Sequence, residues 1–255
     1  MRIISFSADG IKSAADKGFY QWMRDQDADF VCVQDLHCSE YDLQADTFFP
    51  SDYNAYFYDH VDGKINGVAI YCKTLPKAIM TGLGFTDFDM EGRYIQADYS
   101  NISIGCIVVP EGGEPGSDEA ARKAEFLNLL QAHLGKVRNK RREFIICGGW
   151  NLAHTAADVQ DTDSNSNHSG FLPEERQWLD EVLELGYVDA FREINSDQDE
   201  FSYWPDGDRA SNGWRSDYHL ISKGLKYQVE YGAIYKSQEF SRHAPIIMDY
   251  DIEPV

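Results

Sequence analysis

The sequence predicts a layered α/β fold in which two β-sheets pack face to face and helices cover their outer faces. Apolar strand-like runs alternate with amphipathic helical stretches, and the last third of the chain returns to strands. With 255 residues, of which 43% are hydrophobic and 13% aromatic, the chain can bury one large core. No repeat or linker divides it, so we expect one domain spanning residues 1–255.

The first half alternates strands with one helical stretch. A strand over residues 2–8 precedes a helical pattern whose apolar face carries Ile11, Ala15, Phe19, Trp22 and Met23. The run DFVCVQD, residues 29–35, is apolar on both faces, which is typical of a central strand. Turn residues then separate three further strands, at 66–73, 93–100 and 102–110.

The second half contains two capped helices. Ser117 is a predicted N-cap, and the helix behind it has an apolar stripe of Phe126, Leu129, Leu130 and Leu134. A strand follows at 143–149, and a second helix begins at Pro173 and ends at Gly186. The last strands are predicted at 217–222, 228–235 and 246–252. Two polar loops, 111–119 and 160–170, read as surface insertions at strand ends.

The chain is strongly acidic, with a net charge of −20 from 43 acidic and 23 basic residues. Such a surface repels phosphate backbones, so we expect little binding to nucleic acid unless basic residues cluster. One cluster, KVRNKRR, carries Lys136, Arg138, Lys140, Arg141 and Arg142. It is either a solvated helix end favoured by the helix dipole, or a surface that touches RNA or an acidic partner.

The cysteines and the N-terminus indicate a reducing, cytoplasmic protein. Five cysteines form no CxxC pair, and four lie in strand-like runs, which favours buried free thiols over disulfides or zinc. No stretch approaches the ~20 apolar residues of a membrane span, and MRIISFSADG lacks the features of a secretory signal.

Eight segments together resemble the exonuclease–endonuclease–phosphatase family, and within it the exonuclease III branch. They occur in the family's order and run from Arg2 to Tyr250: MRIISFSADG, DFVCVQD, NGVAIYCK, EGRYIQAD, CGGWNLAH, GFLPEERQWLDEVLELGYVDAFR, NGWRSDYHLIS and FSRHAP. The resemblance implies a four-layered α/β sandwich of two mixed sheets flanked by helices. It also implies a divalent metal held by carboxylates, a base for water and donors for the phosphate.

Several positions depart from the family's pattern. The carboxylate expected before Trp150 is Gly149, although Asn151 is retained. The family's metal-binding glutamate is Asp35, one methylene shorter, and its phosphate-binding tyrosine is Val108. The remaining positions implied by the resemblance are Ser7, Asp9, Asp217, Arg242 and His243.

These departures predict a catalytically inactive protein without a bound metal. Arg242 stands where the family has an acid, so we expect its charge to disfavour the imidazolium form of His243. The amino-acid sequence of several segments, such as QD and FSRHAP, resembles that of a bacterial branch of the family, the catabolite repression control proteins. That resemblance implies a translational regulator that acts with the RNA chaperone Hfq on A-rich mRNA sites.

Two enzymatic alternatives stay open. One is a Mg²⁺-dependent exonuclease III-like endonuclease for abasic sites in DNA or exodeoxyribonuclease, and the other is a related phosphodiesterase or phosphatase on a smaller substrate. Aromatic residues at predicted strand ends offer stacking platforms for bases, or else fill the space between the sheets. They are Trp150, Tyr203, Trp204 and Trp214.

Overall fold

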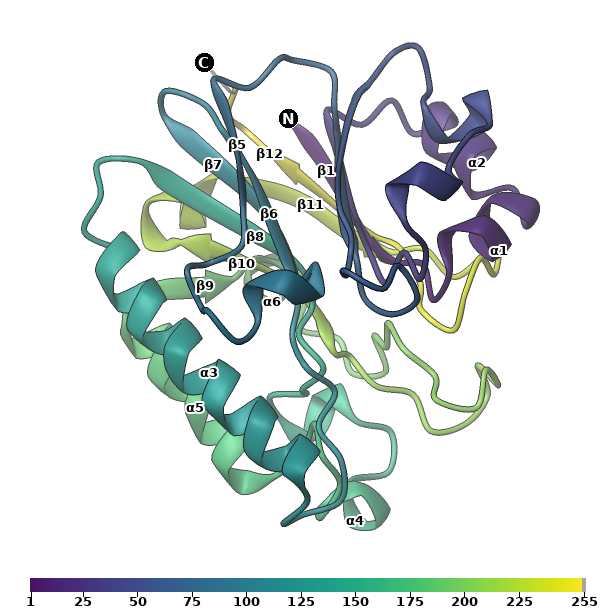
Figure 1. The fold of residues 1–255 in the computed structure, drawn as a ribbon. Coiled ribbons are helices and arrows are strands. Elements are labelled where there is room, and N and C mark those ends of the chain that lie inside the picture. The colour runs from purple at the N-terminus through teal and green to yellow at the C-terminus, as the bar shows by residue number, and fades with distance from the viewer. Residues whose placement is uncertain (254–255) are drawn as a thin grey trace.

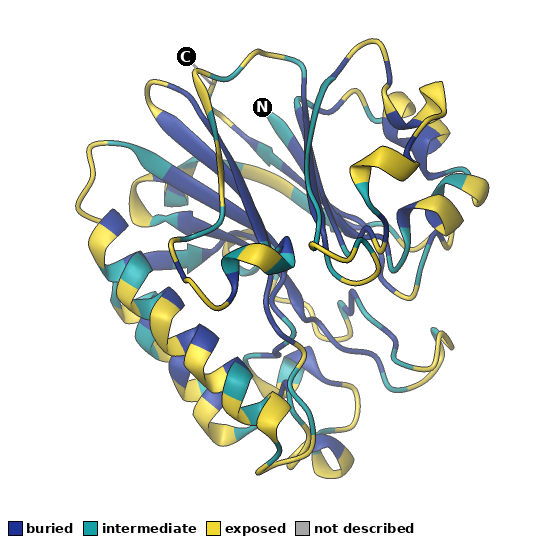
Figure 2. Ribbon diagram, viewed as in Figure 1, coloured by how far each residue is buried: buried dark blue, intermediate teal, exposed yellow. Residues whose placement is uncertain are grey.

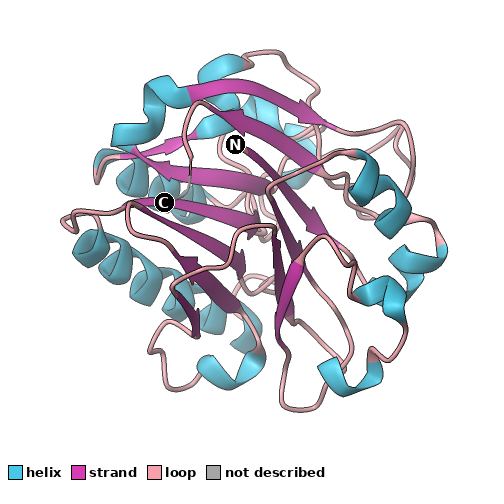
Figure 3. Ribbon diagram, turned by 90° about the horizontal axis from the view of Figure 1, so that it is seen from above, coloured by secondary structure: helices cyan, strands magenta, loops and turns pink. Residues whose placement is uncertain are grey.

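The computed structural model describes residues 1–253, so the last two residues of the predicted domain lie outside it. Two six-stranded mixed sheets pack face to face, and helices cover the outer face of each (Figure 1). Seen from above, the strands lie between outer layers of helices (Figure 3). The predicted four-layered fold is confirmed.

The first sheet has the strand order β11-β12-β1-β2-β4-β3. Its only parallel pair among the described strands is β1–β2. The strand bounds are β1 Arg2–Ser7, β2 Phe30–Gln34, β3 Asn54–Tyr58, β4 Val68–Cys72, β11 Val229–Ile234 and β12 Ile246–Tyr250. Strand β2 is buried along its whole length, as its apolar sequence predicts.

The second sheet has the order β5-β6-β7-β8-β10-β9 and again contains one parallel pair, β7–β8, in the described chain. Its strands are β5 Ala78–Thr81, β6 Tyr94–Asp98, β7 Ile102–Val108, β8 Glu143–Gly149, β9 Tyr187–Asp189 and β10 Asp217–Ser222. Each parallel pair sends two carboxyl-terminal strand ends to one edge of its sheet.

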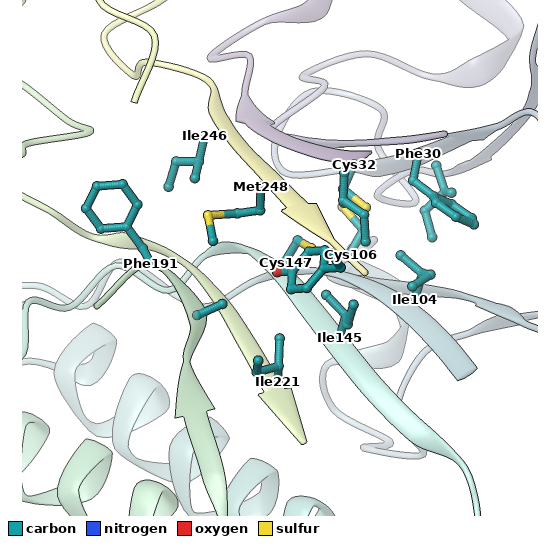
Figure 4. Packing of buried hydrophobic residues seen from close by; sticks show 14 of the residues in the cluster. Phe30, Cys32, Ile104, Cys106, Ile145, Cys147, Phe191, Ile221, Ile246 and Met248 are labelled. Atoms are coloured by element: carbon teal, nitrogen blue, oxygen red, sulfur yellow. The ribbon is translucent and has the colours of Figure 1, made fainter. Parts of the chain in front are cut away.

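The main core lies between the sheets. Ile104 and Ile145 of one sheet face Phe30 and Met248 of the other, and Cys32, Cys106 and Cys147 gather between them (Figure 4). All five cysteines are free and buried, as predicted. Burial raises the pKa of Cys106 well above its usual value, so this thiol stays protonated at neutral pH.

The helices bury apolar residues against the outer faces of the sheets. Helices α1 (Ile11–Asp16) and α2 (Phe19–Asp25) cover the first sheet. Helices α3 (Asp118–Val137) and α5 (Pro173–Glu184) cover the second, and their outward faces are exposed (Figure 2). The remaining helices are short: α4 Thr162–Asn165, α6 Ala190–Ile194, and the 3₁₀ turns Glu40–Asp42, Asp46–Phe48, Asp89–Glu91, Ala156–Asp158 and Lys223–Gln228. No helix in the described chain is long and apolar enough to cross a bilayer.

Two helix predictions need correction. The single predicted helix over residues 11–23 is broken, because Gly18 adopts a left-handed φ of 91° between α1 and α2. In α3 the predicted stripe residue Leu129 is 38% exposed, and Leu127 is buried in its place. Leu127 faces α5, where its carbonyl accepts a hydrogen bond from Trp178 Nε1 at 2.8 Å.

Candidate active site

The two sheets bring several strand ends to one edge of the sandwich. There β1 ends at Ser7 beside Gln34 of β2, and β8 ends at Gly149 between Val108 of β7 and Asp217 of β10. A cleft of about 430 Å³ opens at this edge. Residues singled out in the sequence that line it are Ser7, Asp9, Asp35, Asn151, Tyr203, Trp214, Arg242 and His243.

Strained backbone marks the cleft. Among the described residues, eight residues other than glycine have a left-handed φ, and five of them line the cleft: Asp9, Asp35, His37, Asn151 and Asn212. Asp and Asn tolerate this conformation better than most residues, yet it still costs free energy. The tight turns that follow β1, β2 and β8 direct these polar groups to the cleft.

Asp35 follows β2 directly. Its Oδ2 accepts a hydrogen bond from Ser7 Oγ at 2.5 Å, and its Oδ1 lies 3.9 Å from His37 Nε2. No arginine or lysine contacts this carboxylate in the described chain. Asp35 therefore presents an anionic oxygen donor whose position is fixed by Ser7.

Arg242 pairs with Asp9 and does not act on His243 as predicted. Its Nε donates to Asp9 Oδ2 at 2.6 Å, and its Nη1 donates to the carbonyl of Pro205 at 3.3 Å. The hydrogen bond from Arg242 lowers the pKa of Asp9. The Arg242 side chain remains 44% exposed and lines the cleft.

His243 has a different acid as its partner. Its Nδ1 lies 3.0 Å from Asp217 Oδ2, which also accepts from Ser202 Oγ at 2.6 Å. The ring of Tyr203 stacks on the imidazole at 4.3 Å between centroids. Burial lowers the pKa of His243, but Asp217 more than offsets this and the pKa is raised. The predicted loss of the imidazolium form is therefore wrong, because Asp217 comes from the neighbouring sheet and could not be paired from sequence.

Gly149 leaves room for a side chain. A Cβ added there would meet Asp217 Oδ1 at an ordinary contact distance of 3.7 Å, and no other neighbour would lie within 4 Å. Gly148, in contrast, lies so close to β7 that a Cβ would come within 1.9 Å of the Ile107 carbonyl oxygen. Packing against β7 therefore requires a glycine at position 148 but not at position 149.

Asn151 is held to the protein at both its side chain and its backbone. Its Nδ2 donates to the Val109 carbonyl at 2.6 Å, and its own carbonyl accepts from Lys123 Nζ at 2.7 Å. The side-chain oxygen is the remaining polar group of this residue that can serve a ligand in the cleft.

Three other predicted residues, Val108, Trp150 and Trp204, do not line the cleft. Val108 is buried between the sheets, and Trp150 is 1% exposed and packs against Trp178, so Trp150 cannot stack on a base. Trp204 is buried too, whereas Trp214 and Tyr203 border the cleft.

The basic run lies at the opposite end of β8 from the cleft, about 20 Å away at the usual rise per strand residue. Arg142 pairs with Asp98, and Arg138 donates to the Leu185 carbonyl. Lys136, Lys140 and Arg141 are exposed. Contact between this run and Hfq, RNA or another partner stays a prediction.

The sequence reading missed several groups of the cleft. His37, Glu111 and His168 line it, as do parts of the two loops that were read as surface insertions. The position of the two loops in the sequence could have indicated their role, because each loop follows or precedes an element that ends at the cleft. Lys123 and Glu175 were also missed, because charged residues in helices are usually solvated.

The donor set suits only one kind of metal site. No three His, Cys, Asp or Glu side chains converge as a metal cluster within residues 1–253. Mg²⁺, however, needs only one or two carboxylates when water and substrate phosphate complete its shell. Asp35 offers a hard oxygen donor of that kind, and the side-chain oxygen of Asn151 is a second. The residues fit a cation that binds together with a phosphate.

The chain belongs to the Endonuclease/Exonuclease/phosphatase family, whose pattern matches residues 8–239. It is 32% identical to the DNA repair nuclease APEX1 of Danio rerio over 254 residues, 97% of this chain and 81% of that one. It is 29% identical to an exodeoxyribonuclease of Bacillus subtilis (strain 168), covering 96% and 98% of the two chains. The structure of an AP endonuclease from Archaeoglobus fulgidus superposes with a TM-score of 0.90 and 24% identity, over 99% of this chain and 100% of that one.

These comparisons overturn the predicted function. The relatives are named as DNA nucleases, and none of those above is named as a catabolite repression control protein. The prediction of a regulator without enzymatic activity is therefore wrong. The physical reason lies in the site: the departures from the family pattern together predict an inactive cleft, whereas the structure keeps Asp35, Asn151 and a complete His243–Asp217 pair at one cleft.

Proposed function

We propose that this chain is a Mg²⁺-dependent phosphodiesterase that hydrolyses DNA, of the abasic-site endonuclease or exodeoxyribonuclease type. The observation that carries the proposal is the His243–Asp217 pair, 3.0 Å apart, in a cleft that also presents Asp35 and Arg242. The names of the relatives support a DNA substrate.

His243 is the proton acceptor for the attacking water in this proposal. Asp217 holds Nδ1, which leaves Nε2 for the cleft, and Ser202 fixes the carboxylate in turn. This is the arrangement in which an acid orients a histidine base and stabilises its charged form. Tyr203, stacked on the ring, restricts its rotation.

In this proposal the phosphate is bound by Arg242, the arginine that lines the cleft. The Arg242 guanidinium donates to phosphate oxygens, and the hydrogen bond from Asn151 to the Val109 carbonyl fixes the segment that follows β8. A bound Mg²⁺ would be held by Asp35 and would supply positive charge against the phosphate oxygens. Ser7 keeps Asp35 in the orientation that such a cation needs.

Cleavage of defined DNA duplexes tests the proposal. One labelled duplex carries a single abasic-site analogue and another a recessed 3′ end, each incubated with Mg²⁺, with Mn²⁺ or with chelator. We expect metal-dependent cleavage that falls by about 10²-fold or more in Asp35→Ala and His243→Ala. Arg24→Ala, an exposed change on α2 at the opposite edge, is the matched control. Intact duplexes with either metal, from protein shown to be folded, would refute the proposal.

A further inference from the structure

A buried ion pair lies beneath the cleft. Lys123 of α3 is 2% exposed, and Glu175 in the first turn of α5 is 5% exposed. The Lys123 Nζ and Glu175 Oε1 are 2.7 Å apart. Burial lowers the pKa of Lys123 although Glu175 opposes the shift, as expected for a pair removed from water.

The other hydrogen bonds of the lysine reach the cleft. Its Nζ donates to the backbone oxygen of Asn151 at 2.7 Å and to that of Glu111 at 3.2 Å. It also donates to Ser169 Oγ at 3.3 Å. One ammonium group therefore contacts the segments that follow β7 and β8, and both segments line the cleft.

The glutamate holds a third segment. Its Oε2 accepts from the backbone amides of Gly170 at 2.6 Å and Leu172 at 3.0 Å. Ser169 joins the two sides, since its Oγ donates to the Glu111 carbonyl at 2.9 Å. Three chain segments that are far apart in the sequence meet at this one pair.

Stability alone does not explain the pair. Replacing a buried ion pair with apolar residues of similar volume is often neutral or stabilising, because desolvation offsets the attraction. Capping of α5 accounts for the bond from Glu175 to Leu172. It does not account for a fully buried lysine directed at the backbone of Asn151, where a methionine would fill the same space.

We propose that Lys123 and Glu175 are positioning residues that hold Asn151 and the 111–113 and 168–171 segments in the geometry needed for catalysis. The inference rests on the proposed function of the cleft. Neither side chain touches the substrate; both act through the backbone of cleft residues. A shift of about 1 Å in such groups is enough to slow a reaction about 10²-fold.

The test compares two double variants. Lys123→Met with Glu175→Leu replaces the pair by apolar side chains and leaves no unpaired charge. Arg2→Met with Asp249→Leu does the same for a partly exposed ion pair between β1 and β12, and is the control for the loss of an ion pair away from the cleft. We expect the first variant to keep a cooperative thermal transition, to lose about 10- to 100-fold in kcat, and to change KM by less than about threefold. The control should keep wild-type kcat.

Hydrogen exchange provides a readout that does not depend on activity. In the first double variant, amides of residues 149–153 and 168–172 should exchange faster, while those of β1 and β2 should not change. A folded variant with unchanged exchange and unchanged kcat would overturn the inference. If the wild-type protein cleaves no DNA, the proposed function fails, and hydrogen exchange alone tests whether the pair holds the cleft segments. Faster exchange in the double variant supports that role of Lys123 and Glu175, and unchanged exchange excludes it.

Discussion

Placing a carboxylate at the end of β8 tests the proposed chemistry most directly. An added Cβ at position 149 would meet only Asp217 Oδ1, at 3.7 Å. The Cβ of an aspartate therefore fits at this position, and Gly149→Asn supplies the same shape as Gly149→Asp without the charge. The new carboxylate is a second proton acceptor for the attacking water. A positioned acid or base contributes about 10²- to 10⁴-fold to a rate, so we expect at least a tenfold gain.

The same change has a calculable effect on stability. Two unit charges about 4 Å apart interact by about 4 kcal/mol at an effective dielectric constant of 20. Asp217 is buried, so little water screens this repulsion. Gly149→Asp should therefore unfold more easily than Gly149→Asn in chelator, by about 1 to 4 kcal/mol because partial protonation relieves part of the repulsion. A divalent cation bound beside the two carboxylates should remove most of that difference.

The measurements are urea unfolding, with and without Mg²⁺, and initial cleavage rates of the abasic-site duplex. The expected pattern is a tenfold or greater rate increase for Gly149→Asp over Gly149→Asn, with a larger Mg²⁺-dependent stabilisation. If both variants fold, bind DNA equally and cleave at the same rate, the reasoning about the cleft is refuted. Gly148→Ala should fail to fold, because its Cβ would overlap the Ile107 carbonyl.

Three further outcomes follow from the charges of the site and core. Asp217 raises the pKa of His243, so wild-type activity should rise only as pH passes above that raised value, and Asp217→Asn should move the rise to lower pH in a pH–rate profile. Asp158→Asn removes one of the two carboxylates that lie 2.7 Å from the buried guanidinium of Arg215, while Asp189 remains, and should cost about 1.5 to 3 kcal/mol in urea unfolding. A wild-type midpoint would contradict it. Arg242→Ala should raise KM about tenfold with little change in kcat, and a change in kcat alone would exclude phosphate binding by this residue.

The sequence was sufficient to predict the layers of the fold because they depend on periodicity. Strands buried on both faces, such as residues 30–34, are continuously apolar, and this pattern survives without tertiary information. The break between α1 and α2 was missed because Gly18 interrupts a helical pattern without a change in its apolar spacing. The burial of Leu127 depends on the angle at which α5 packs beside α3, which no local pattern contains.

The site was predictable in position but not in pairing. Asp35 and Gly149 end predicted strands and Asn151 follows one, and the family resemblance implies that they share a site. The partners were not predicted: Asp217 binds His243 across 26 residues, and Asp9 binds Arg242 across 233. Reading Arg242 only as the immediate neighbour of His243 gave the wrong sign for the pKa of the histidine. Side-chain direction, and not sequence distance, decides which charges interact.

Under the proposed function, the negative charge of the chain favours coupled binding of the cation and the phosphate. A phosphate that approaches a protein of net charge −20 is repelled, and a cation at Asp35 without a phosphate has few protein ligands. When both are bound, the cation offsets the repulsion between the phosphate and the acidic protein, and the phosphate supplies oxygen ligands to the cation. Linkage then requires that DNA raise the affinity for Mg²⁺ by the same factor by which Mg²⁺ raises the affinity for DNA. In the proposed function the substrate would therefore complete the metal site, and few protein carboxylates would be needed to hold the cation.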